Sequence, residues 1–249
     1  MSFSISFRPW HVLRCATLLT AMPFLLSSCT TAPPQSSLKH PPKNARVLDL
    51  SQQAEYTPSA THLQLQQAPA NYLVWLNRAD NKERVQRYEH YLSQNRANRA
   101  VPMYQLLRSA RDWEKCGADP YSVPTAELWS NLLPTLQIIQ YLVETKALRE
   151  YEVTSVYRDY SLNICAGGAA GSKHVYNSAI DFRIGSAANR PEDVLLVEYT
   201  KNKLCEFWRN HGQALNMGLG VYASGQIHID TQGYRTWGPD HTRKTSICQ

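Results

Sequence analysis

Two short segments in the second half of the chain, 179–184 and 226–231, alternate apolar and ionisable residues, and this pattern limits the fold more than any other feature. Alternation with a period of two is typical of a β-strand that is buried on one face. The residues expected on the buried faces are Ile180, Phe182, Ile227 and Ile229. The opposite faces carry Asp181 in one strand and His228 with Asp230 in the other. Pairing of the two strands in one sheet would bring Asp181 close to His228.

A second histidine precedes the first of these strands. His174 lies seven residues before Asp181, after a turn-like run of Gly, Ser and Lys, and a loop there can fold His174 over Asp181. Two imidazoles and one carboxylate match a catalytic zinc site, in which three protein ligands leave a fourth position for water. A lone histidine on a strand is more often an ordinary surface or core residue. The spacing alone leaves both interpretations open.

The rest of the chain divides into a helical part and a mixed part. Apolar residues recur at 3–4 spacing through 71–147, which predicts helices, one of them running from Met103 to Ala110. Pro134 is expected to kink or split the last helix of this part. Within 148–249, strands are predicted at 151–157, 179–184, 218–222 and 226–231, and a helix at 192–211. The order of elements predicts an α+β fold, with a helical N-terminal part packed on a small, mainly antiparallel sheet.

The N-terminus has the pattern of a bacterial lipoprotein. Basic residues precede the apolar stretch 15–26, which is short for a membrane span and has the length of a signal-peptide core. Residues 26–29, Leu-Ser-Ser-Cys, resemble a lipobox, which implies removal of a signal peptide of residues 1–28 and lipidation of Cys29. An ordinary signal peptide with an incidental cysteine is the alternative. Thr30, in place of the Asp that retains such proteins at the inner membrane, favours the outer membrane.

Residues 29–70 are rich in Pro, Ser, Gln and Thr, and this composition predicts a flexible tether. A coil of ~40 residues spans roughly 35 Å, which lifts a domain away from a membrane surface. The formal net charge of +6 suits an anionic polymer or membrane as partner. No run of Lys and Arg interleaves with aromatic residues, so nucleic-acid binding is not indicated. Neither protein partners nor the oligomeric state can be read from the sequence.

Four cysteines follow the tether, and export would place them in an oxidising compartment. Four cysteines allow three pairings, of which Cys116–Cys165 together with Cys205–Cys248 is favoured. No Cys-x-x-Cys spacing occurs, which argues against a cysteine-rich zinc site. No cysteine stands in a recognisable nucleophile motif, so the predicted role of these residues is structural.

Residues 172–181, Ser-Lys-His-Val-Tyr-Asn-Ser-Ala-Ile-Asp, resemble the Ser-x-His-x-x-Gly-x-Ala-x-Asp motif of the zinc D-alanyl-D-alanine peptidase superfamily. That superfamily includes D-Ala-D-Ala carboxypeptidases, L-alanyl-D-glutamate endolysins and murein endopeptidases, and it shares its zinc fold with Sonic hedgehog. The Gly of the motif is Asn177 here, a residue that tolerates a left-handed backbone. Residues 155–163 resemble the Ser-Gly-Tyr-Arg-Ser segment of the superfamily, and 218–230 resemble the segment with its last zinc ligand. The resemblance covers roughly residues 71–238.

This resemblance implies roles for individual residues. It implies one zinc ion per chain, with three ligands: His174, Asp181 and His228. It also implies that Arg158 contacts a substrate carbonyl or carboxylate, and a structural salt bridge is the alternative role. Many relatives place an acid three residues before the last histidine, a position that is Gly225 here. Asp230 is the best substitute as general base, and orientation of a histidine is its alternative role.

Four more residues are candidates to line the cleft, with ordinary packing as the alternative: Tyr157, Ser172, Tyr176 and Trp237. These features together predict a zinc-dependent peptidase that hydrolyses D-alanyl bonds in peptidoglycan stem peptides or crosslinks. It would act as a D,D-carboxypeptidase or a murein endopeptidase, and the tether favours the latter. It would be lipid-anchored in the cell envelope and face the periplasm. The alternatives are a non-catalytic, zinc-containing lipoprotein that binds peptidoglycan, and a structural envelope lipoprotein without metal.

Overall fold

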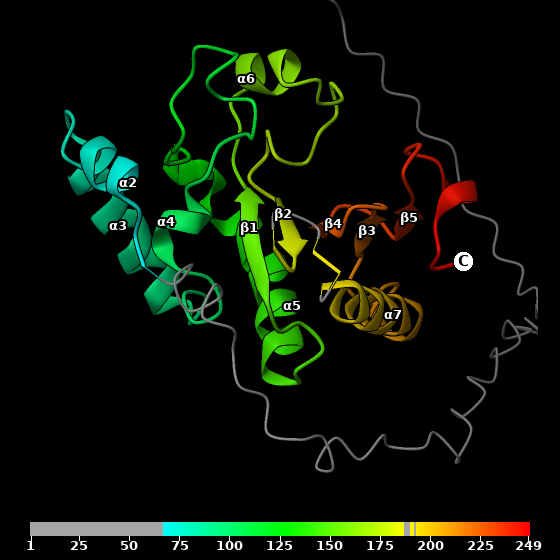
Figure 1. Ribbon diagram of the computed structural model, residues 1–249. Coiled ribbons are helices and arrows are strands. Elements are labelled where there is room, and N and C mark those ends of the chain that lie inside the picture. The colour runs from blue at the N-terminus through cyan, green and yellow to red at the C-terminus, as the bar shows by residue number, and fades with distance from the viewer. Residues whose placement is uncertain (1–66, 187–189, 192) are drawn as a thin grey trace, which may run out of the picture. The chain divides into compact units, whose positions relative to one another are not determined.

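The computed structural model describes residues 67–186, 190–191 and 193–249 (Figure 1). The predicted signal peptide, the lipidated Cys29 and all of the tether up to residue 66 lie outside these residues. The first helix of the described residues begins at Ala70. Among the described residues, no helix has both the length and the apolar character needed to cross a membrane.

The first part of the described chain is helical, as predicted. Its elements are α2 (Ala70–Leu76), α3 (Asn81–Gln94), α4 (Met103–Leu106), a 3-10 helix (Ala126–Leu132) and α5 (Leu133–Glu144). Pro134 lies in the first turn of α5, where the missing N–H of proline removes no helical hydrogen bond. The predicted break at this proline is therefore confirmed as the junction between the 3-10 helix and α5.

The helix predicted from Met103 to Ala110 is wrong beyond its first turn, because α4 ends at Leu106. The backbone after α4 finds partners far away in the sequence instead. The N–H of Val156, for example, donates to the carbonyl of Arg108 at 2.8 Å. Tertiary hydrogen bonds thus satisfy the backbone groups that a longer helix would have paired internally.

A five-stranded sheet follows, in the spatial order β1-β2-β4-β3-β5. All neighbouring strands are antiparallel except β3 and β5, which are parallel. The strands are β1 (Tyr151–Ser155), β2 (Ala179–Ile184), β3 (Gly218–Val221), β4 (Gln226–Asp230) and β5 (Arg235–Trp237). Mixed helix and sheet, with a mainly antiparallel sheet, is the predicted architecture.

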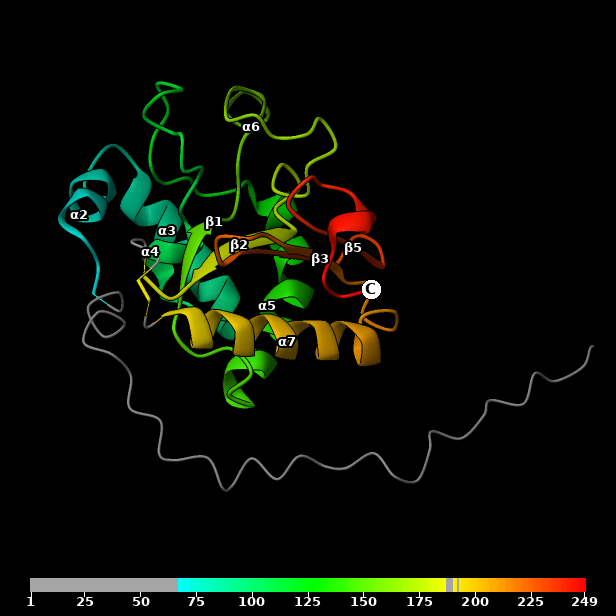
Figure 2. The ribbon, with the colours of Figure 1, turned by 45° about the vertical axis from the view of Figure 1, so that its right-hand side comes forward.

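Two further helices complete the frame around the sheet: α6 (Tyr160–Cys165) and α7 (Asp193–His211). Figure 2 shows α7 running along one side of the sheet and α6 on the opposite side, while α5 lies behind β1 and β2 in Figure 1. The rings of Tyr141 in α5 and Phe207 in α7 are 5.5 Å apart, so these two helices are neighbours. Ile180 and Phe182 are fully buried in the core, as the alternation in β2 predicts, and this leaves Asp181 on the opposite face.

Both disulfides form in the favoured pairing, Cys116–Cys165 and Cys205–Cys248. The second bond connects α7 to the C-terminal end of the chain. The first connects the irregular segment after α4 to the end of α6. Because both of these segments lead into the walls of the cleft described below, the first disulfide holds those walls together.

Candidate metal centre

Asp181 and His228 come together through the register of two strands. β2 and β4 pair antiparallel with Asp181 directly opposite His228, so their side chains leave the same face of the sheet. The Nδ1 atom of His228 lies 2.8 Å from Oδ1 of Asp181. The prediction that these two strands pair and bring both residues together is confirmed.

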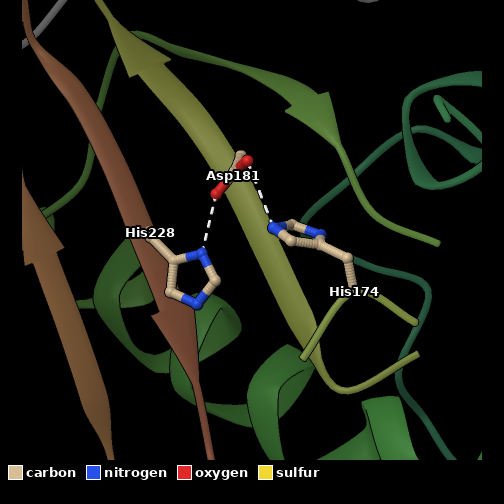
Figure 3. Close-up of side chains that lie close together, drawn as sticks. All are labelled: His174, Asp181 and His228. Atoms are coloured by element: carbon tan, nitrogen blue, oxygen red, sulfur yellow. Dashed lines mark hydrogen bonds and ion pairs between the residues drawn. The ribbon is translucent and has the colours of Figure 1, made fainter. Parts of the chain in front are cut away.

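His174 lies in the loop between α6 and β2, and this loop folds the imidazole over Asp181 (Figure 3). Its Nε2 atom lies 3.1 Å from Oδ2 of Asp181. The turn after His174 depends on Asn177, which has a φ of 51° and therefore the left-handed backbone expected of it. Asn177 also donates from Nδ2 to the carbonyl of Leu128 at 3.0 Å, which anchors the turn to the helical part.

Hydrogen bonds select the tautomer of each imidazole. The Nδ1 atom of His174 is 2.6 Å from the carbonyl oxygen of Val156, which can only accept, so Nδ1 carries the proton. The Nε2 atom of His228 is 2.9 Å from Oδ2 of Asp230, and this nitrogen donates to the carboxylate in the same way. The other two nitrogens face Asp181: Nε2 of His174 with its lone pair, and Nδ1 of His228 as the atom that carries the second proton when this imidazole is charged. One ligand atom from each of these three residues lies within 4.8 Å of the others.

This arrangement is suited to a metal ion. Although Nε2 of His174 is 3.1 Å from Asp181, the geometry is not that of a hydrogen bond, so this buried nitrogen has no hydrogen-bond partner. An unpaired buried nitrogen is costly unless something else satisfies it, and a cation between the two imidazoles and the carboxylate would do so. His174, Asp181 and His228 could therefore hold a divalent metal ion.

The pKa values of the three side chains show what binding a cation requires. Burial lowers the pKa of His174, with Asp181 partly opposing this, so His174 is neutral. Burial raises the pKa of Asp181, but the two histidines outweigh it and keep that pKa well below its usual value. Burial also opposes a charge on His228, but its hydrogen bonds to Asp181 and Asp230 outweigh this and raise its pKa to about 9. In the metal-free protein at neutral pH, only His228 must lose a proton before it can bind a metal.

Asp230 lies behind His228 and is completely buried. Its Oδ1 atom accepts from the N–H of Gln232 at 2.8 Å, and Arg235 donates to both of its oxygens at 3.1 and 2.6 Å. Asp230 meets the Nε2 side of the His228 ring, opposite the nitrogen that faces Asp181. This placement favours the orienting role of Asp230 over the role of general base, because its oxygens are already occupied.

Two glycines in β3 make room for this arrangement. A Cβ atom at Gly218 would lie 2.6 Å from Oδ2 of Asp230, and a Cβ atom at Gly220 would lie 2.6 Å from the ring of Trp237. Gly218 and Gly220 are the register partners of Arg235 and Trp237 in β5. Their missing side chains let Arg235 reach Asp230 across β3, and let Trp237 lie 5.1 Å, ring to ring, from His228.

Arg158 forms the structural salt bridge that was the alternative to its predicted role in substrate binding. It is mostly buried, and its Nη2 atom donates to Oδ2 of Asp181 at 2.7 Å. Its Nε atom donates to Oγ of Ser155 at 2.8 Å, which holds the guanidinium in place. The structural salt bridge is therefore present, and Arg158 also lines the cleft in which a substrate would lie.

The ligands open onto a cleft of about 670 Å³. Ser172 and Trp237 line it, as predicted, but Tyr157 and Tyr176 do not. Tyr157 is partly buried, which raises the pKa of its hydroxyl, and Tyr176 is half exposed beyond the His174 turn. For these two tyrosines the structure favours the alternative, a position outside the cleft lining.

The structure adds cleft residues that the sequence patterns missed: Arg111, Lys173, Tyr222, His241 and Arg243. The Nε1 atom of Trp237 donates to the hydroxyl of Tyr222 at 2.9 Å, and that hydroxyl is 3.5 Å from Nδ1 of His241. This contact places a third imidazole in the cleft. No periodicity marks these residues, since they come from separate loops and strand ends.

Gly225 adopts a φ of 78° in the turn between β3 and β4. A Cβ atom there would lie 3.2 Å from the carbonyl of Ile184 and 3.4 Å from Val197 in α7, and Gly225 does not line the cleft. An acidic side chain at this position would therefore start towards α7. Residue 225 therefore supplies no acid to the cleft, and the conformation of this turn would direct an acidic side chain away from it.

No family model matches the chain, and no curated protein is significantly similar to it.

Proposed function

We propose that the protein is a zinc-dependent peptidase that hydrolyses D-alanyl peptide bonds in peptidoglycan stem peptides or crosslinks, as a D,D-carboxypeptidase or a murein endopeptidase. The observation that carries this proposal is the convergence of His174, Asp181 and His228, with both tautomers set by hydrogen bonds, at an open cleft. Two nitrogen ligands and one oxygen ligand are a catalytic zinc set. Bound there, zinc would act as a Lewis acid and lower the pKa of a water ligand towards 7.

Three side chains around the metal ligands would support the reaction: Arg158, Asp230 and Trp237. The Arg158 guanidinium, held by Ser155 and Asp181, is positioned to bind the carbonyl oxygen of the scissile bond and to stabilise the negative charge that develops there. Asp230 keeps His228 in the tautomer that binds metal. Trp237 packs beside His228 and shields it from solvent.

Proton transfer is assigned to His241 in this proposal, since residue 225 is a glycine and the oxygens of Asp230 are already hydrogen-bonded. His241 is the cleft imidazole that is not a metal ligand, and Tyr222 can hydrogen-bond to its Nδ1 atom. It would accept the proton of the attacking water and return it to the leaving amine, so that no net proton is consumed. His241→Gln should lower kcat by about 100-fold at unchanged zinc content, whereas an unchanged kcat would remove His241 from this role.

The cellular setting belongs to the same proposal. Two disulfides support export to an oxidising compartment. The lipobox-like segment supports an anchor at Cys29, with the domain facing the periplasm, and outer-membrane attachment is favoured. A mainly antiparallel sheet that carries a His-Asp-His group also supports the relation to the D-Ala-D-Ala peptidase and hedgehog-type zinc fold.

The test uses purified protein loaded with zinc, a D-alanyl-D-alanine pentapeptide, crosslinked muropeptide dimers, and His174→Ala as control. Loss of a terminal alanine identifies a carboxypeptidase, and conversion of dimers to monomers identifies an endopeptidase. The proposal fails if zinc-loaded protein releases no product that the control lacks.

A second candidate is a zinc-containing lipoprotein that binds peptidoglycan without cutting it. The observation that favours it concerns the described residues that line the cleft. Asp181 is the only carboxylate among them, and as a metal ligand it is not available as a general base. Equimolar zinc and binding to purified cell wall, with no hydrolysis of either substrate, would support this alternative.

A further inference from the structure

The cleft carries a strong excess of positive charge. Five cationic side chains line it: Arg111, Arg158, Lys173, Arg235 and Arg243. Among the described lining residues, Asp181 is the only carboxylate. A concave surface lined by one sign of charge concentrates ligands of the opposite sign.

Two of these cations are already neutralised within the protein. Arg158 pairs with Asp181 at 2.7 Å, and Arg235 pairs with the buried Asp230 at 2.6 Å. Both of them therefore serve the metal centre. The other three cations of the cleft pair with neither Asp181 nor Asp230: Arg111, Lys173 and Arg243.

None of these three forms a salt bridge to any residue in the described part of the chain. Lys173 has only a weak contact with an aromatic ring, because its Nζ atom lies 5.9 Å from the ring of Tyr176. Lys173 also directly precedes the ligand His174 in the sequence, and both residues line the cleft.

The segment of backbone that carries Arg111 is held by a hydrogen bond on one side and a disulfide on the other. The preceding Ser109 is buried and donates through Oγ to the carbonyl of Asp119 at 2.6 Å. Five residues after Arg111, the disulfide Cys116–Cys165 connects this wall to the start of the glycine-rich segment 166–171, which lines the cleft from another side. The backbone that presents the Arg111 guanidinium is therefore constrained at both ends.

Arg111 also lies close to the centre of the cleft. Tyr222 lines the same cleft as Arg111 and Arg158; burial raises the pKa of Tyr222, and its hydrogen bond with Trp237 and the charges of these two arginines oppose this rise. Tyr222 in turn hydrogen-bonds to Trp237, which packs beside His228. A peptide lying across the metal centre would therefore pass within reach of Arg111.

We propose that Arg111, Lys173 and Arg243 bind free carboxylates of the substrate, so that the cleft selects acidic peptides over amidated ones. This inference rests on the proposed peptidase function and narrows its substrate class. Stem peptides offer two sources of such a group, the α-carboxylate at the peptide end and the side-chain carboxylate of a diamino acid. Charged hydrogen bonds from a guanidinium or ammonium to a carboxylate supply the selectivity, which salt reduces.

Four versions of one stem peptide test the proposal: both carboxylates free, the terminal one amidated, the diamino-acid one amidated, and both amidated. The wild-type protein should show a kcat/KM about tenfold higher or more for each carboxylate that the cleft binds. The pattern across the four peptides identifies which carboxylate is bound.

Single variants then connect the preference to the residues. Arg111→Gln, Lys173→Gln and Arg243→Gln should each reduce the ratio of free-acid to amidated kcat/KM. Lys115→Gln and Lys244→Gln are matched controls, because both lysines are exposed neighbours that do not line the cleft. These controls should keep the wild-type ratio.

Equal wild-type kcat/KM for all four peptides would overturn the proposal, as would three cleft variants that all keep the wild-type ratio. Should no peptide be cut at all, the peptidase function fails separately. The selectivity is then read from calorimetric binding of the same four peptides to the zinc-loaded protein. Equal Kd values would overturn it there, and a Kd about tenfold lower for the free acid would support it.

Discussion

The role of Asp230 allows a sharp test, because its two possible roles predict different outcomes for Asp230→Asn. The buried carboxylate accepts the proton of His228 Nε2 and is held by Arg235 and by the N–H of Gln232. An asparagine oxygen can still accept from His228, but it carries no charge and is a weaker partner. Loss of such a partner behind a metal-binding histidine lowers metal affinity about 10- to 100-fold, which corresponds to about 1.4–2.7 kcal/mol.

Zinc affinity of Asp230→Asn is measured by competition with a chromophoric chelator, and activity is measured with saturating zinc. An orienting residue should show weaker zinc binding and a kcat that largely recovers once zinc is saturating. A general base should show unchanged zinc affinity and a kcat that stays low. Asp119→Asn, a change to an exposed carboxylate far from the ligands in sequence, is the control for charge loss alone. Unchanged zinc affinity in Asp230→Asn would refute the orienting role.

Four further predictions concern His228, the first disulfide and Gly220. Zinc binding at about pH 7 should release close to one proton, because the pKa of His228 is raised to about 9, and calorimetry in buffers of different ionisation enthalpy measures this release. The raised pKa of His228 also stabilises the metal-free protein. This contribution to the free energy of unfolding is fully present below pH 6.5, the ordinary pKa of histidine, and is lost as the pH rises through about 9. Denaturant titrations at several pH values measure it. Replacing Cys116 and Cys165 by serine opens a loop of 49 residues and should cost up to about 4 kcal/mol of unfolding free energy in urea, and no loss would contradict the chain-entropy reasoning. Gly220→Ala should cost about 1–3 kcal/mol and weaken zinc binding, since its Cβ atom would collide with Trp237, and wild-type stability with wild-type zinc affinity would show that the ring moves freely.

Much of the frame could be predicted because it depends on local patterns. The alternation around Asp181 and His228 identifies two strands buried on one face, and a proline within a helical pattern, at residue 134, predicts a kink or a break there. The helix after Met103 was overestimated for the opposite reason. Its later residues have an amphipathic pattern, but their backbone groups pair with distant segments, including Val156, and no local pattern contains that information.

The candidate site divides in the same way. Residue types and spacing were sufficient to name His174, Asp181 and His228 as a group, and strand pairing then brings them together. The left-handed turn at Asn177 could also be anticipated, because few residues other than glycine tolerate it.

The sequence by itself determined four of the five strands, the ligand types and the cysteines available for pairing, because each of these depends on neighbours along the chain. Only the tertiary structure decided which nitrogen of each histidine faces Asp181, because that choice depends on the carbonyl of Val156 and the carboxylate of Asp230. It also decided that Arg111 stands in the cleft while Tyr157 does not. Side chains far apart in sequence meet only after the sheet and the loops around it have formed, so their distances and charges are properties of the fold.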